Sequence, residues 1–160
     1  MDAAEEALAH CRIASLLSLY YQALDTSNWD TLEKEVMAEG AVWEVIQHSP
    51  AGTVRDLAEG RDAVLGWFKR MMGGEVAMSE GTVRHFINTH VITVGAQSAR
   101  STSHLQAVDT NTLKILANGF VEAEHAKTPE GWRISRYKID EHITDADMEA
   151  FKAALGLEFE

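Results

Sequence analysis

The sequence predicts an α+β domain in which three helices pack on one face of a curved, antiparallel sheet. Apolar residues recur at helical spacing near the N-terminus, and several later segments alternate like the strands of a meander. The 160 residues are 46% hydrophobic and 24% charged, which is ordinary globular composition for one domain. We therefore expect a single domain over residues 1–160, without internal repeats or a linker.

Three helices are expected, over residues 3–24, from about Trp29, and after Gly60. The first has an apolar stripe of residues three or four positions apart, made by Ile13, Leu17, Tyr20, Tyr21 and Leu24. Residues 26–28 end this helix and can cap the second one, which turns Leu32 and Val36 inward. The third helix turns Trp67 and Phe68 inward.

Strands are expected over residues 41–46, 83–94, 99–108, 113–124 and 132–139, because these segments alternate or are rich in β-forming residues. Turn-rich segments separate the last four, as in a meander. The segment 145–160 is expected to form a short helix. Two interpretations of it are open, a lid over a cavity and a cover for a subunit contact.

Charge and cysteine content exclude several classes of function. The net charge is −11, with 14 Lys and Arg against 25 Asp and Glu, which argues against nucleic-acid binding. The single cysteine, Cys11, cannot form an internal disulfide, and no Cys/His spacing resembles a zinc site. The acidic N-terminus is unlike a secretory signal, and no apolar stretch approaches the roughly 18 residues of a membrane span. We expect a soluble, cytoplasmic protein that binds no metal and no membrane.

Asp25 lies at the predicted end of the first helix, next to its apolar stripe, where a carboxylate would be partly buried. The alternative is that Asp25 begins the following turn or caps the Trp29 helix. Tyr20 and Tyr21 flank the same stripe, and for both of them core packing is the interpretation that spacing alone favours.

Two histidines occur in the strand over 83–94. Strict alternation places His85 on one side with Thr89 and Val91, and His90 on the other side with Phe86, so the two rings could not share a metal. A lone histidine on a strand is usually structural. His85 becomes a candidate base if Asp25 reaches one ring nitrogen, because the pairing fixes the tautomer and leaves the other nitrogen free.

The next strand places Asp109 on the same face as Ser101, Ser103, Leu105 and Ala107. Asp109 could orient substrate, or it could open the turn over 109–111. We interpret the remaining polar candidates, His125, Lys138 and His142, as surface groups. The large side chains Trp43, Trp67 and Phe68 are interpreted as pocket wall or core.

No glycine-rich phosphate loop, no nucleophile elbow and no base near Cys11 is evident. Dinucleotide-dependent and covalent hydrolytic chemistry are therefore disfavoured. Acid–base chemistry without a cofactor remains.

The order of elements resembles the SnoaL-like family of the cystatin-like, nuclear-transport-factor-like cone fold. The resemblance is carried by the tyrosine–aspartate segment 20–25, by residues 28–32, and by Arg84-His85-Phe86-Ile87 and Gly131-Trp132-Arg133-Ile134. It implies a cone-shaped barrel whose curved sheet, mixed or antiparallel, wraps around the long first helix. Scytalone dehydratases and bile-acid dehydratases are the most similar in pattern.

The resemblance also implies site residues. It makes His85, Asp25 and Tyr20 the catalytic groups, and it puts Asp109 near a further polar position. Tyr21, Trp43, Trp67 and Phe68 would join Asp109 in contacting substrate. The strand tyrosine of scytalone dehydratases falls near Val45 here, a departure that argues against scytalone itself as the substrate.

The expected function is that of a cofactor-independent lyase, a dehydratase acting on a hydroxylated cyclic or aromatic-related small molecule. The same groups could serve an isomerase or an aldehyde-releasing carbon–carbon lyase. A non-catalytic module for apolar ligands or for assembly is the alternative from another class. By resemblance, the chain is expected to form a trimer or dimer through its open sheet face.

Overall fold

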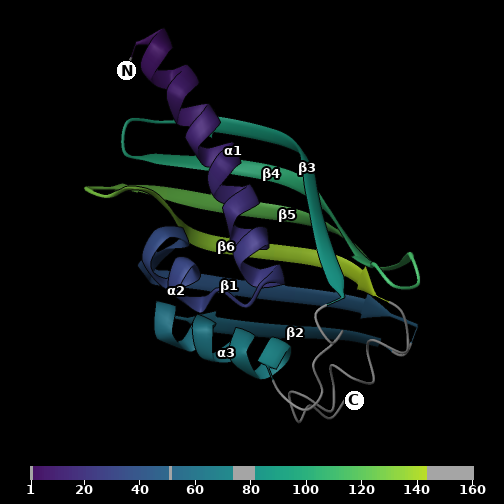
Figure 1. Ribbon diagram of the computed structural model, residues 1–160. Helices are drawn as coiled ribbons and strands as arrows, with labels where there is room; N and C mark the ends of the chain where they lie inside the picture. The colour runs from purple at the N-terminus through teal and green to yellow at the C-terminus, as the bar shows by residue number, and fades with distance from the viewer. Residues whose placement is uncertain (1, 51, 74–81, 144–160) are drawn as a thin grey trace.

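Six β-strands form one mixed sheet, and the helices cover one of its faces (Figure 1). The computed structural model describes residues 2–50, 52–73 and 82–143. Its elements are α1 (Ala3–Asp25), α2 (Trp29–Thr31), the π-helical turn η1 (Leu32–Val36), β1 (Met37–Ser49), β2 (Gly52–Glu59), α3 (Arg61–Gly73), β3 (Val83–Val94), β4 (Ser98–Asp109), β5 (Lys114–Thr128) and β6 (Gly131–Ile143). The predicted α+β class is confirmed.

The strand order is β2-β1-β6-β5-β4-β3, and every neighbouring pair is antiparallel except β1 and β6. The sheet is mixed because the chain leaves β2 through α3, re-enters at the far edge as β3 and winds back, so that β6 meets β1 in parallel (Figure 1). The edge strand β2 was not predicted. Its outward positions include Arg55 and Glu59, and only Val54 is fully buried, which gives a weak hydrophobic signal.

The long helix α1 crosses the inner face of the sheet and supplies the centre of the core (Figure 1). It begins with a capping box in which the Asp2 side chain accepts from the Glu5 N–H and the Glu5 side chain accepts from the Asp2 N–H. The predicted apolar stripe is buried over its whole length. The helix ends at Asp25, and Ser27 follows with a φ of 52°, which turns the chain away.

A β-bulge in β3 reverses the side-chain alternation that the sequence predicted. The register with β4 shifts between Asn88 and Val91, and Thr89 adopts a φ of 54°. The extra residue turns His90 to the inner face, where its Nδ1 lies 2.7 Å from Ser103 Oγ, and leaves Val91 exposed. The prediction that His85 and His90 lie on opposite sides was therefore wrong.

His125, interpreted from sequence as a surface group, belongs to the core. It is 1% exposed, on the inner face of β5, and its Nε2 lies 2.9 Å from Ser101 Oγ. Val121 and Ala123 are buried on the same face, so alternation along β5 places His125 inside. Lys138 and His142 do lie on the outer, partly solvated face of β6.

The predicted C-terminal helix over 145–160, with its role as lid or subunit contact, lies outside the described residues. Among the residues that are described, no helix is long and apolar enough to cross a membrane.

Candidate active site

A mainly apolar cavity of about 90 Å³ lies between α1, α3 and the inner face of the sheet. Its wall is made by the aromatic and aliphatic side chains of Tyr20, Tyr21, Leu24, Trp43, Val45, Trp67, Phe68, Leu105, Tyr137 and Ile139. Three polar side chains also line it, namely His85, Gln47 and Glu141. The cavity therefore combines a mainly apolar wall with a few convergent polar groups, which is typical of small-molecule sites.

Asp25 and His85 form a directly bonded pair, although they are 60 residues apart. The Asp25 Oδ1 atom lies 2.5 Å from His85 Nδ1, and its Oδ2 accepts the backbone N–H of His85 at 3.0 Å. The two side chains are only 8% and 15% exposed. A carboxylate accepts but cannot donate, so Nδ1 carries the ring proton and Nε2 is left as the free basic nitrogen.

The end of α1 and the start of β3 bring this pair together. Asp25 is the last residue of α1, and β3 runs past the helix end with the His85 ring turned inward. The ring of Tyr21, one helical turn before Asp25, stacks on the imidazole with centroids 5.0 Å apart. Helix and strand therefore both fix the plane of the ring.

The Tyr21 and Tyr137 hydroxyls share a buried hydrogen bond across the cavity. Burial raises the pKa of both hydroxyls well above the usual value, and Tyr20 beside them adds to the effect. Both groups are therefore neutral hydroxyls near pH 7. Tyr137 is a site residue that the sequence analysis missed.

Tyr20 is positioned by Trp43. The indole N–H of Trp43 donates to the Tyr20 hydroxyl oxygen at 3.1 Å, so the phenolic proton is free to be donated elsewhere. Burial raises the pKa of Tyr20 far above its ordinary value, which keeps that proton in place. Trp43 is itself held by stacking on Tyr137, with centroids 5.2 Å apart and planes 9° from parallel.

Trp67 and Phe68 close the cavity from α3, with their rings 5.1 Å apart and nearly perpendicular. The indole N–H of Trp67 donates to Asp56 on β2. Phe68 faces Tyr20 and Trp43, at 6.1 and 6.3 Å between centroids. The structure thus places both residues in the cavity wall.

Asp109 does not line the cavity. One of its carboxylate oxygens accepts the Asn111 backbone N–H at 2.9 Å, and the other accepts the Thr112 hydroxyl at 2.8 Å. These bonds, that of Thr112 first, lower the pKa of the Asp109 carboxyl. Of the two interpretations left open by the sequence, the geometry matches the turn.

Gln47 and Glu141 were not predicted as site residues. They form a buried pair joined by a 2.6 Å hydrogen bond from Gln47 Nε2 to Glu141 Oε1. The predicted strand stopped at residue 139, whereas β6 continues to Ile143. Alternation through Tyr137 and Ile139 would have turned Glu141 inward had the strand been extended.

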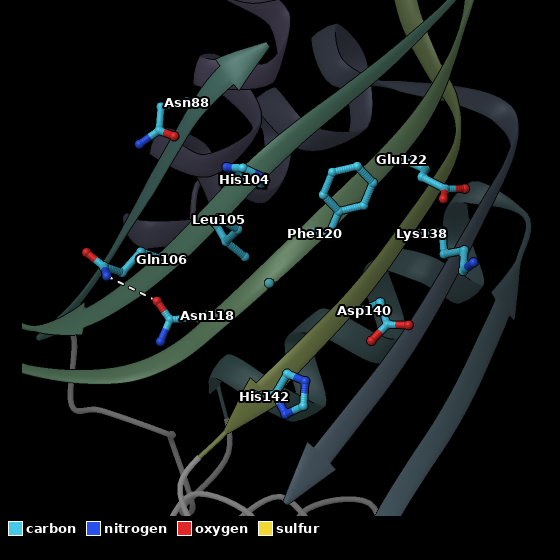
Figure 2. A pocket seen from close by; sticks show the side chains of 11 residues that line it. Asn88, His104, Leu105, Gln106, Asn118, Phe120, Glu122, Lys138, Asp140 and His142 are labelled. Carbon is cyan, nitrogen blue, oxygen red and sulfur yellow. Dashed lines mark hydrogen bonds between the residues drawn. The ribbon is translucent and has the colours of Figure 1, made fainter. Parts of the chain in front are cut away.

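A larger hollow, of about 600 Å³, lies on the outer face of the sheet (Figure 2). Its side chains come from β3, β4, β5 and β6 (Figure 2), and the Gln106 amide donates to Asn118 at 3.1 Å. Asp140, one of the residues that line this hollow, lies 2.9 Å from His48 and forms a His–Asp pair with it. Both of those side chains are substantially exposed. Water screens such a pair, so we place the candidate active site in the inner cavity.

In the part of the chain that the structure describes, no three His, Cys, Asp or Glu side chains gather in a way that could hold a metal ion.

Comparison with known proteins places these features in a family. Residues 5–138 match the model of the SnoaL-like domain. No functionally curated protein matches the sequence.

Several solved structures share this fold. A nuclear-transport-factor-like protein with a cystatin-like fold from Novosphingobium aromaticivorans has a TM-score of 0.70 at 20% identity, covering 98% of this chain and 95% of its own. A protein of that organism provisionally named a scytalone dehydratase has a TM-score of 0.63 at 21% identity, covering 84% of each chain. A protein from Streptomyces avermitilis, provisionally named a dehydratase, has a TM-score of 0.62 at 15% identity, covering 87% of this chain and 97% of its own.

Proposed function

This chain belongs to the SnoaL-like domain family, and from that premise and the inner cavity we propose that it is a cofactor-independent lyase. Its reaction is the removal of water from a hydroxylated cyclic or aromatic-related ketone. The observation that carries the proposal is the Asp25–His85 pair, which presents a free imidazole nitrogen to an aromatic-walled cavity. The dehydratase names of two structural neighbours motivate testing this chemistry first.

The proposed reaction starts with His85 as general base. Nε2 takes the proton from the carbon next to the carbonyl, while Asp25 holds the ring and stabilises the imidazolium that forms. A positioned base of this kind contributes about a hundredfold to ten-thousandfold in rate. Low exposure of both side chains strengthens the pairing, because little water screens it.

Tyr20 stabilises the enolate. Its hydroxyl accepts from Trp43, which orients it, and donates its own proton to the developing oxyanion. Because burial raises the pKa of Tyr20, the hydroxyl remains a hydrogen-bond donor throughout. Protonated His85 then returns its proton to the leaving hydroxyl, which departs as water.

Product analysis tests the proposal. A panel of β-hydroxy cyclic ketones is incubated with the protein, and the molecular masses of the products are measured by mass spectrometry. Loss of one water supports dehydration, an unchanged mass means isomerisation, and loss of a carbon unit means carbon–carbon cleavage. The last two outcomes would contradict the proposed reaction but leave the acid–base site in place.

Variants test the site. We expect His85→Ala to lower kcat/KM by about a hundredfold or more. Asp25→Asn should have a similarly large effect, because its amide can donate to Nδ1 and favour the wrong tautomer. The control is His104→Ala, an exposed histidine on the outer face of β4. Full turnover by His85→Ala would rule out all three reactions and leave ligand binding as the function.

A further inference from the structure

Gln47 and Glu141 are two polar side chains of the cavity that take no part in the proposed reaction. They are direct neighbours across the parallel pair of β1 and β6, and both point to the inner face. Gln47 is 3% exposed and Glu141 is 8% exposed. An amide and a carboxyl are costly to bury, so their position in an otherwise apolar wall requires an explanation.

A glycine on the neighbouring strand allows the side chain of Glu141 to pack against its backbone. Gly119 on β5 faces it directly, and a Cβ atom on Gly119 would lie 2.8 Å from Glu141 Cβ and 3.2 Å from the Asp140 carbonyl oxygen. Any residue other than glycine would collide there. The backbone of β5 therefore packs closely against the glutamate stem and holds it toward the cavity.

His85 is the one group of the described cavity wall that can carry a positive charge. No Lys or Arg is among the described residues that line it. The titratable groups that share the cavity are His85, Tyr20, Tyr21 and Tyr137, with Asp25 behind the imidazole. Burial raises the pKa of the Glu141 carboxyl, while the hydrogen bond from Gln47 and the positive charge of protonated His85 oppose the rise. Burial in this wall therefore favours the protonated, acid form of Glu141.

Gln47 supplies a second, independent observation. Its Nε2 is bonded to Glu141, but its Oε1 is fully buried and has no hydrogen-bond partner among the described residues. Buried carbonyl oxygens are nearly always satisfied. Because the Gln47 side chain lines the cavity, this unpaired acceptor is a candidate partner for a hydroxyl of the ligand.

We infer that Gln47 and Glu141 form the subsite for the leaving hydroxyl of the substrate, with Gln47 Oε1 accepting its hydrogen bond and Glu141 acting as the acid that protonates it. This inference rests on the proposed function, and it gives Glu141 the second proton transfer in place of His85. His85 Nε2 takes the proton next to the carbonyl, and the C–H electron pair forms the enolate. The enolate then expels the hydroxyl, whose oxygen takes the Glu141 proton and leaves as water.

The step balances. It leaves an imidazolium at His85 and a carboxylate at Glu141, and transfer of one proton between them through the released water restores both groups. The substrate class follows from this arrangement. The substrate is uncharged, with a carbonyl that reaches Tyr20 and a β-hydroxyl that reaches Gln47. A substrate carboxylate would instead face the unpaired oxygen of Gln47 and the carboxyl of Glu141, and no Lys or Arg of the described cavity wall could neutralise it.

A binding experiment tests the subsite without turnover. Phenol, toluene of the same heavy-atom count, and benzoate are titrated into the protein and followed by NMR. We expect phenol to bind about tenfold or more tightly than toluene, and benzoate to be the weakest, because a site built for a hydroxyl rejects analogues that lack it. Gln47→Leu should abolish the preference for phenol. Asp140→Asn, on the outer face of β6 beside Glu141, is the control and should retain it.

A kinetic experiment tests the acid. Glu141→Gln keeps hydrogen-bonding capacity but has no proton to give, so we expect kcat to fall about a hundredfold with little change in KM. The wild-type kcat should decline as the pH rises through the raised pKa of Glu141, and this decline should vanish in Glu141→Gln. Thermal unfolding confirms that each variant is folded.

The outcomes separate the two proposals. Equal binding of phenol and toluene by the wild type, or an unchanged kcat in Glu141→Gln, overturns the subsite even if His85→Ala is inactive. A phenol preference that depends on Gln47, in a protein that dehydrates none of the ketones, supports the subsite and overturns the proposed reaction.

Discussion

The buried His125 should make the protein lose stability in mild acid. Burial lowers the pKa of His125 to about 4, from an ordinary value of 6.5. Between these values the unfolded chain binds a proton that the folded chain does not, so the free energy of unfolding decreases as the pH falls from 6.5 toward 4. Its Nδ1 has no hydrogen-bond partner among the described residues, which leaves a protonated ring poorly solvated.

The size of the effect follows from the two pKa values. Each pKa unit corresponds to about 1.4 kcal/mol, so His125 alone accounts for about 3 kcal/mol once the pH is below both values. Between pH 7 and pH 5, where most carboxylates remain ionised, the expected loss is about 2 kcal/mol. That is a large fraction of the stability of a small domain.

The assay is urea unfolding of the wild type and of His125→Gln at pH 7, 6 and 5. Glutamine can still bond to Ser101 Oγ but does not titrate, so His125→Gln should lose about 2 kcal/mol less than the wild type over this range. Other titrating groups are common to both proteins and cancel in the difference. His142→Gln, the same change on the outer face of β6, should follow the wild type. Parallel stability curves for wild type and His125→Gln would refute the reasoning.

Two further predictions concern packing in the same region. Gly119→Ala should destabilise the protein by about 1–3 kcal/mol, because the new Cβ would lie 2.8 Å from Glu141 Cβ. Gly40→Ala should be nearly neutral in thermal unfolding, because a Cβ there would meet no atom of the described residues within 4 Å. Equal effects of the two changes would contradict this. Tyr21→Phe should cost about 1–3 kcal/mol by leaving the Tyr137 hydroxyl buried without its partner, and the double change with Tyr137→Phe should recover part of the loss. If the double variant lost as much free energy of unfolding as the two single variants together, the result would argue against a shared hydrogen bond.

Features set by local pattern were predictable from the sequence. The stripe on α1 places Tyr20 and Tyr21 in the core and Asp25 at the helix end, since helical periodicity depends only on nearby residues. The strands that alternate clearly were found as well, and alternation in β3 holds over its regular part, from Val83 to Asn88.

The failures arose where a long-range contact overrides the local pattern. The bulge that turns His90 inward changes the register between β3 and β4, and strict alternation cannot anticipate an inserted residue. The end of β6 was misjudged because Asp140, Glu141 and His142 look polar, although β1 and β5 pair with them from both sides. That error of four residues concealed Glu141.

The two polar pairs of the site are brought together in different ways. Asp25 and His85 come from a helix end and an edge strand, so their meeting depends on how α1 crosses the sheet. Gln47 and Glu141 come from central strands and are set opposite each other by backbone register alone. Movement of α1 along the sheet would therefore separate Asp25 from His85 but leave the amide–carboxyl pair intact. The two pairs can therefore vary independently, so a change at Gln47 and Glu141 needs no change in the base.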